Sequence, residues 1–101
     1  MGTYWITFRI HQNLTYDTRY AALVKAVEEH LATKCWSEPT SFWLFDSNSS
    51  AAEIAASCKA VIDPKVDQVV IGSPMTKTMI VVGKVDDIKK LQSIVDFAKQ
   101  G

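Results

Sequence analysis

The sequence has little glycine, proline or cysteine, and neither sign of charge is in excess. Its 101 residues include four glycines, three prolines and two cysteines, and eleven basic residues balance eleven acidic ones. The glycines are not clustered, so there is no Gly-rich loop of the kind that cradles phosphates. A neutral chain has no overall field to attract nucleic acid. These absences argue against a nucleotide-binding loop and against a strongly nucleic-acid-binding module.

The two cysteines, Cys35 and Cys58, lie far apart, and neither belongs to a CxxC or CxxH pair. Structural zinc is therefore not expected. The chain enters an apolar strand almost at once, so we expect no secretory signal and interpret both cysteines as free thiols in the cytoplasm. One disulfide between them is the alternative. The longest apolar run is far short of the roughly 20 residues that span a bilayer, which argues against a membrane protein.

Length and apolar content indicate a single domain over residues 1–101. Hydrophobic residues make up 48% of the chain. A domain of this size buries only about 60–65% of the surface that its unfolded chain exposes. We therefore expect some apolar surface to remain available to a partner.

The hydrophobic periodicity predicts the order β-α-β-β-α-β, followed by one more strand and one more helix. Strands are predicted over 3–10, 34–38, 41–46, 68–72 and 78–83, and helices over 18–32, 50–62 and 86–98. Ser50 and Glu53 fit a capping box at the start of the second helix. The fold class is α+β, and the first six elements match the ferredoxin-like arrangement, in which helices cover one face of an antiparallel sheet.

The uncovered face of this sheet is the candidate functional surface. In the first strand, Trp5, Thr7 and Arg9 point away from the apolar set. The predicted homodimer interface consists of Trp5, Thr7, Arg9, Trp43, Phe45, Met79 and Val81. The competing interpretation is that the aromatic residues stack on RNA bases. The strand SFWLFDS contains no glycine and no basic residue, unlike RNA-recognition domains, and this favours the dimer.

Three stretches resemble a known group of small proteins. YWITFRI in the first strand, SFWLFDSNSSAAEI across the third strand and the next helix, and DQVVIG in the fourth strand are similar to the SinR-like small proteins. These resemble the CRISPR adaptation endonuclease that partners the spacer integrase, and the virulence-associated protein D toxins. The resemblance covers about residues 3–73. It implies a ferredoxin-like homodimer joined through its open sheet faces, with the strand 78–83 extending the partner's sheet.

Nucleases of this group place an aspartate at the end of the first strand, and two such residues hold a divalent metal between protomers. Here Arg9 stands at that position. An arginine cannot ligate magnesium, and its charge repels the ion. The resemblance therefore implies no metal site and no cofactor, and we lean against an enzyme.

The first hypothesis is thus a non-catalytic homodimeric binding or scaffold protein in a prokaryotic defence, counter-defence, toxin or mobile-element setting. Its partner is a protein or a nucleic acid. The neutral net charge of the chain does not support the nucleic acid. Arg9 is interpreted either as a phosphate or carboxylate ligand or as one half of a salt bridge across the dimer to Asp46. The second hypothesis is a nuclease or RNA-cleaving toxin that has moved its Mg²⁺ or Mn²⁺ ligands to Asp17 or His11. The third is a regulatory domain that binds a small ligand.

Overall fold

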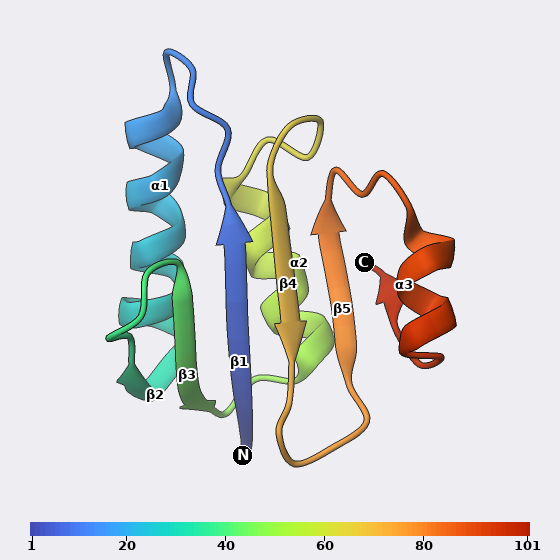
Figure 1. Cartoon of the computed structure of the whole chain (residues 1–101). Coiled ribbons are helices and arrows are strands. Elements are labelled where there is room, and N and C mark those ends of the chain that lie inside the picture. Colours follow the sequence, from blue (N-terminus) through green and yellow to red (C-terminus); the bar gives the residue numbers. More distant parts are fainter.

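The computed structural model describes all 101 residues, and it consists of one mixed β-sheet with α-helices packed around it (Figure 1). The strands are β1 (Gly2–Arg9), β2 (Ala32–Trp36), β3 (Phe42–Ser47), β4 (Gln68–Gly72), β5 (Met79–Gly83) and β6 (Lys99–Gln100). The helices are α1 (Tyr16–Lys25), its continuation as the π-helix η1 (Ala26–Leu31), α2 (Ala51–Val61) and α3 (Ile88–Ile94). The predicted α+β class is confirmed.

The six strands lie in the order β2-β3-β1-β4-β5-β6. All neighbours are antiparallel except β5 and β6, which are parallel. Ile6 in the central strand β1 lies opposite Trp43 of β3 on one side and Ile71 of β4 on the other. These three side chains are buried in the same core, because residues directly opposite in a sheet point to the same face.

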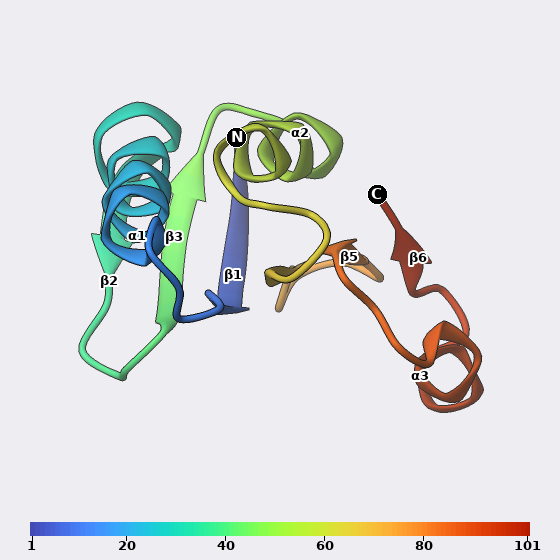
Figure 2. The same cartoon turned by 90° about the horizontal axis from the view of Figure 1, so that it is seen from above.

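The main core lies between the sheet and the helices α1, η1 and α2. Figure 2 shows α1 and α2 on one side of the sheet and α3 on the other. Each helix contributes an apolar stripe: Leu23 and Val27 come from α1 and η1, and Ile54 and Cys58 come from α2. The face of the sheet that carries Trp5, Thr7 and Arg9 is therefore left without cover from these helices.

The capping box predicted at the start of α2 is confirmed. The Glu53 backbone N–H donates to Ser50 Oγ at 3.2 Å, and the Ser50 N–H donates to Glu53 Oε1 at 2.8 Å. These two bonds satisfy donors that have no partner within the helix. Helix α1 begins two residues earlier than predicted, and its N-cap position is held by Thr15 without a side-chain cap bond.

The first helix and two later elements differ from the prediction. The helix that begins at α1 finishes as a π-helix, which hydrophobic spacing does not reveal. Strand β5, expected to extend a partner's sheet, pairs over its whole length with β4 of its own chain. The last helix is shorter than predicted, and the chain turns back into β6 beside β5. No helix has both the length and the apolar composition needed to cross a membrane.

Candidate functional site

The open face of the sheet, named here for the side without α1 and α2, gathers residues from four strands. Trp5 lies between Leu44 and Gly72, and Thr7 lies between Phe42 and Val70 in the next row. Met79 of β5 extends the first row past Gly72. The residues between these rows belong to the core face, since side chains alternate along each strand. The open face is thus largely apolar.

Trp5 lies flat across the neighbouring strand because Gly72 has no side chain. A Cβ atom at Gly72 would stand 2.2 Å from the Trp5 ring carbon Cζ2, far inside van der Waals contact. Gly72 is itself buried, although it faces the open side. The glycine therefore leaves room for the Trp5 indole over β4.

The structure corrects three members of the predicted interface. Trp43, Phe45 and Val81 are only 3%, 2% and 1% exposed, so none of them is available to a partner. Trp43 and Phe45 belong to the core under the helices. Phe42 and Leu44 hold the open-face positions of β3 instead, because they lie opposite Thr7 and Trp5.

The other predicted interface residues, Trp5, Thr7, Arg9 and Met79, are at least partly exposed. A second aromatic group lies at the edge of the same face. Trp36 of β2 is opposite Leu44 and is 46% exposed. Its ring meets the Phe42 ring edge-on, with centroids 6.3 Å apart. Trp36 Nε1 donates to Glu38 at 2.6 Å, so its polar atom is satisfied while its ring stays available.

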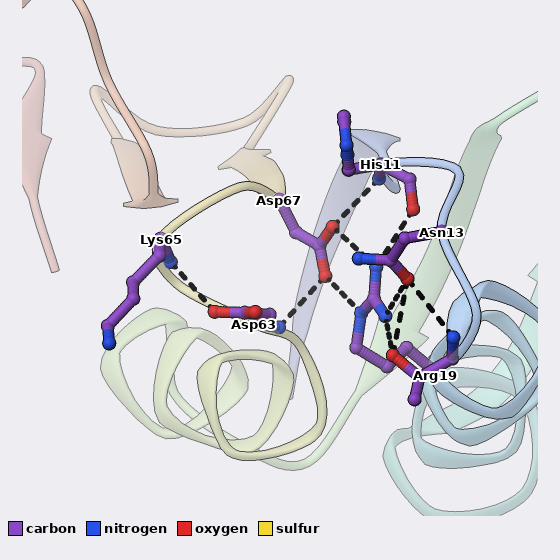
Figure 3. A network of polar contacts seen from close by, with 7 residues as sticks. His11, Asn13, Arg19, Asp63, Lys65 and Asp67 are labelled. Carbon is purple, nitrogen blue, oxygen red and sulfur yellow. Dashed lines mark hydrogen bonds and ion pairs between the residues drawn. The ribbon is translucent and has the colours of Figure 1, made fainter.

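A buried polar junction closes the end of the sheet where β1 finishes (Figure 3). Asp67 is fully buried, and its two oxygens accept four hydrogen bonds. Oδ2 accepts from Arg19 Nε and the Asp63 N–H, both at 2.8 Å, and Oδ1 accepts from the His11 N–H at 2.8 Å and Arg19 Nη2 at 3.2 Å. The junction joins the segment after β1, helix α1 and the segment before β4.

Burial alone would raise the pKa of Asp67, but the hydrogen bonds from Arg19 and from the Asp63 and His11 N–H groups outweigh it. The pKa of this carboxyl is therefore lowered, and the group stays ionised at neutral pH. Arg19 also donates to the His11 carbonyl at 2.9 Å, to Asn13 at 2.9 Å and to Thr15. Every buried side-chain polar atom has a partner. We interpret the junction as a structural clamp.

The sequence reasoning missed this clamp, because Arg19 and Asp67 are 48 positions apart. One signal pointed to it: Asp67 stands immediately before the apolar strand QVVIG, where a carboxylate needs a compensating donor.

The alternative catalytic residues lie near the junction, but both side chains are exposed. His11 contributes only backbone atoms to it, and Asp17 lies in the first turn of α1. No three His, Cys, Asp or Glu side chains come together to form a metal-holding group. Asp46 accepts from Thr3 Oγ1 at 2.8 Å, at the opposite end of the sheet from Arg9.

The cysteines are both free. Cys58 is buried in the core, and burial raises the pKa of its thiol to about 12. Cys35 is exposed on β2, and its pKa is raised first by partial desolvation and then by the charge of Glu28. Neither thiol is activated as a nucleophile, since the thiolate is the reactive form.

Comparison of the chain with protein-family models, with curated proteins and with solved structures finds no match.

Proposed function

We propose that this chain is a non-catalytic, homodimeric binding protein of the cytoplasm, built on a ferredoxin-like protomer whose open face is covered by a second copy. The strand order β2-β3-β1-β4, with α1 and α2 on one side, supports the ferredoxin-like assignment. Strands β5 and β6 with α3 are additions to that unit. The observation that carries the proposal is the apolar open face, centred on Trp5.

A second copy suits this face better than a nucleic acid does. Around Trp5 the open face presents Phe42, Leu44, Val70 and Met79, and the chain carries no net charge. Single-stranded nucleic acid binds to aromatic platforms within positively charged grooves. Closed two-fold dimers are the commonest oligomers of soluble proteins, and they pair one apolar patch with itself. The resemblance to the SinR-like proteins supports the same arrangement and suggests a prokaryotic defence, toxin or mobile-element setting.

Arg9 supports the non-catalytic part of the proposal. It ends β1 on the open face, at the position where the nucleases of the resembling group carry their metal-binding aspartate. In a face-to-face dimer two arginines would then occupy the region of that metal site, and their charge disfavours a divalent cation. Incubation with DNA and RNA in the presence of Mg²⁺ or Mn²⁺ tests this point. Cleavage that disappears in Asp17→Asn, with the fold intact, would overturn it.

The dimer is tested by replacing an open-face side chain with a charged one. Leu44→Asp places a carboxylate beside Trp5, and we expect it to convert the dimer into a monomer in light scattering. The matched control is Leu14→Asp, because Leu14 is fully exposed in the segment before α1. We expect the control to keep the mass of the parent protein. Equal masses for the parent and both variants would contradict the proposed interface.

A further inference from the structure

A groove runs along the open face, between the sheet and the segment that contains α3. It encloses about 310 Å³. Its lining includes Arg9, Val70, Met79 and Val81 from the sheet and Asp86 and Leu91 from the segment that follows β5. The groove exists because α3 stands away from the sheet, beyond β5, on the side opposite α1 and α2 (Figure 2). Helix α3 therefore projects above one edge of the open face, whereas the other edge, formed by β3 and β2, has no helix over it.

Helix α3 is poorly covered by its own chain. None of its residues is buried. Leu91 faces the groove, while Ile94, one turn further along the same side of the helix, is 75% exposed. Phe97, just after the helix, is 41% exposed. A helix of seven residues gains little stability from its own hydrogen bonds and needs packing of its apolar side. Its own protomer supplies only part of that packing.

Two opposite charges flank the groove, and neither has a close partner. Arg9 is exposed and forms no ion pair within the chain. The Asp86 side chain is 80% exposed, and its single ionic contact is to Lys84 Nζ at 4.0 Å. The neighbouring Asp87 is already engaged, because its side chain accepts from the Lys90 N–H at 3.0 Å and caps α3. Beside the groove, Arg9 is thus an unpaired cation and Asp86 a largely exposed anion.

Resting on the proposed dimer, we infer that the two copies are related by a two-fold axis that runs along the strands near β4. In this arrangement α3 of each copy covers the β3 and β2 edge of the other, which carries Trp36 and Phe42. Arg9 of each copy then meets Asp86 of the partner subunit. The register supports this pairing, because Arg9, Gln68 and Gly83 lie in one row, and Asp86 follows Gly83 at the same end of the sheet.

A two-fold axis perpendicular to the strands fits the shape of the open face less well. A two-fold axis perpendicular to the strands exchanges the two ends of the sheet but keeps its left and right edges in place. Arg9 would then approach Asp46 of the partner subunit, and the two raised α3 helices would meet head-on and hold the sheets apart. The axis along the strands exchanges the edges instead, so each raised helix meets a bare edge. The structure therefore favours Asp86 over Asp46 as the partner of Arg9.

The sheet face alone is too small for a stable dimer, so α3 must contribute to the interface. Four strands about 4.8 Å apart, each with about six residues rising about 3.3 Å, cover on the order of 400 Å². A stable interface buries about 800 Å² on each partner. The sheet face alone falls short, and α3 with its exposed Ile94 and Phe97 supplies the additional apolar surface.

Charge reversal with mixing tests the inference. Arg9→Glu alone brings two acids together at each of the two symmetry-related contacts, and Asp86→Arg alone brings two bases together there. We expect each variant to raise the dimer dissociation constant about tenfold. An equimolar mixture restores both attractive pairs, since each mixed dimer contains one native pair and one reversed pair. Native mass spectrometry should therefore show the mixed dimer well above its statistical proportion.

Control variants make the outcomes distinct. Lys65→Glu and Glu29→Arg reverse exposed charges outside the groove lining, and their mixture should give the statistical proportion of mixed dimer. If Arg9→Glu is rescued by Asp46→Arg and not by Asp86→Arg, the axis runs across the strands and the inference is wrong. If the parent protein is a dimer whose stability neither Arg9→Glu nor Asp86→Arg changes, the inference fails while the proposed function stands. A monomeric parent protein removes both.

Discussion

Replacing Asp67 by asparagine should destabilise the protein strongly, because each carboxylate oxygen accepts one backbone N–H and one guanidinium N–H. The amide retains only one acceptor oxygen. Whichever oxygen becomes the NH₂ group, either the His11 or the Asp63 N–H loses its acceptor, and so does one donor of Arg19. An unsatisfied buried donor costs about 1–3 kcal/mol, and bonds to charged groups are worth about 1.5–3 kcal/mol.

The Arg19 side chain is 11% exposed and keeps other acceptors, so its lost bond costs little. We therefore expect Asp67→Asn to lower the free energy of unfolding by about 3 kcal/mol. For a domain of this size that corresponds to a fall in Tm of roughly 10–20 °C. Urea unfolding followed by circular dichroism measures it. Asp96→Asn, at an exposed acid, serves as the control and should change the stability by less than about 0.5 kcal/mol. A loss below about 1 kcal/mol for Asp67→Asn would refute the clamp.

Acid should reduce the difference in stability between the parent protein and Asp67→Asn. The pKa of Asp67 is lowered in the folded protein, so ionisation of this group stabilises the fold above the unfolded-state pKa. That contribution is lost as the pH falls through the folded pKa. The stability gap between the parent protein and Asp67→Asn should therefore stay constant at neutral pH and narrow only below about pH 4. A gap that closes near pH 6 would contradict the assigned cause.

Three further predictions concern single sites. Gly72→Ala should push the Trp5 ring off β4, which shifts the tryptophan fluorescence and costs about 1–3 kcal/mol of stability; an unchanged emission spectrum would contradict the packing. A thiol reagent should modify Cys35 in the native protein, whereas Cys58, whose pKa is raised to about 12, should react only after unfolding; mass spectrometry of peptides decides between them. Ser50→Ala should cost about 1 kcal/mol in thermal unfolding through loss of the capping box, and an unchanged Tm would contradict it.

The order of strands and helices was predictable because local signals mark their ends. The alternation around Ile6 and the capping box at Ser50 are both readable from neighbouring residues. The facing of β3 was not, because Phe42, Trp43, Leu44 and Phe45 are large and apolar on both sides of the strand. Only the register with β1 decides which pair enters the core, and register is a property of two strands.

The candidate site was predictable only in part, for a similar reason. Trp5, Thr7 and Arg9 could be assigned to the open face from their alternation with the apolar set. The groove beside them could not, because it depends on where the chain carries α3 after β5. The clamp between Arg19 and Asp67 likewise joins distant segments, and no local pattern indicates that such a pair will meet.

The mass of the parent protein in solution tests the central claim most directly. Light scattering from low to high micromolar concentration should give a constant mass of two chains, because the face around Trp5 is buried against a second copy. A mass of one chain over that range would contradict the account, since the open face would then have no cover from a second copy.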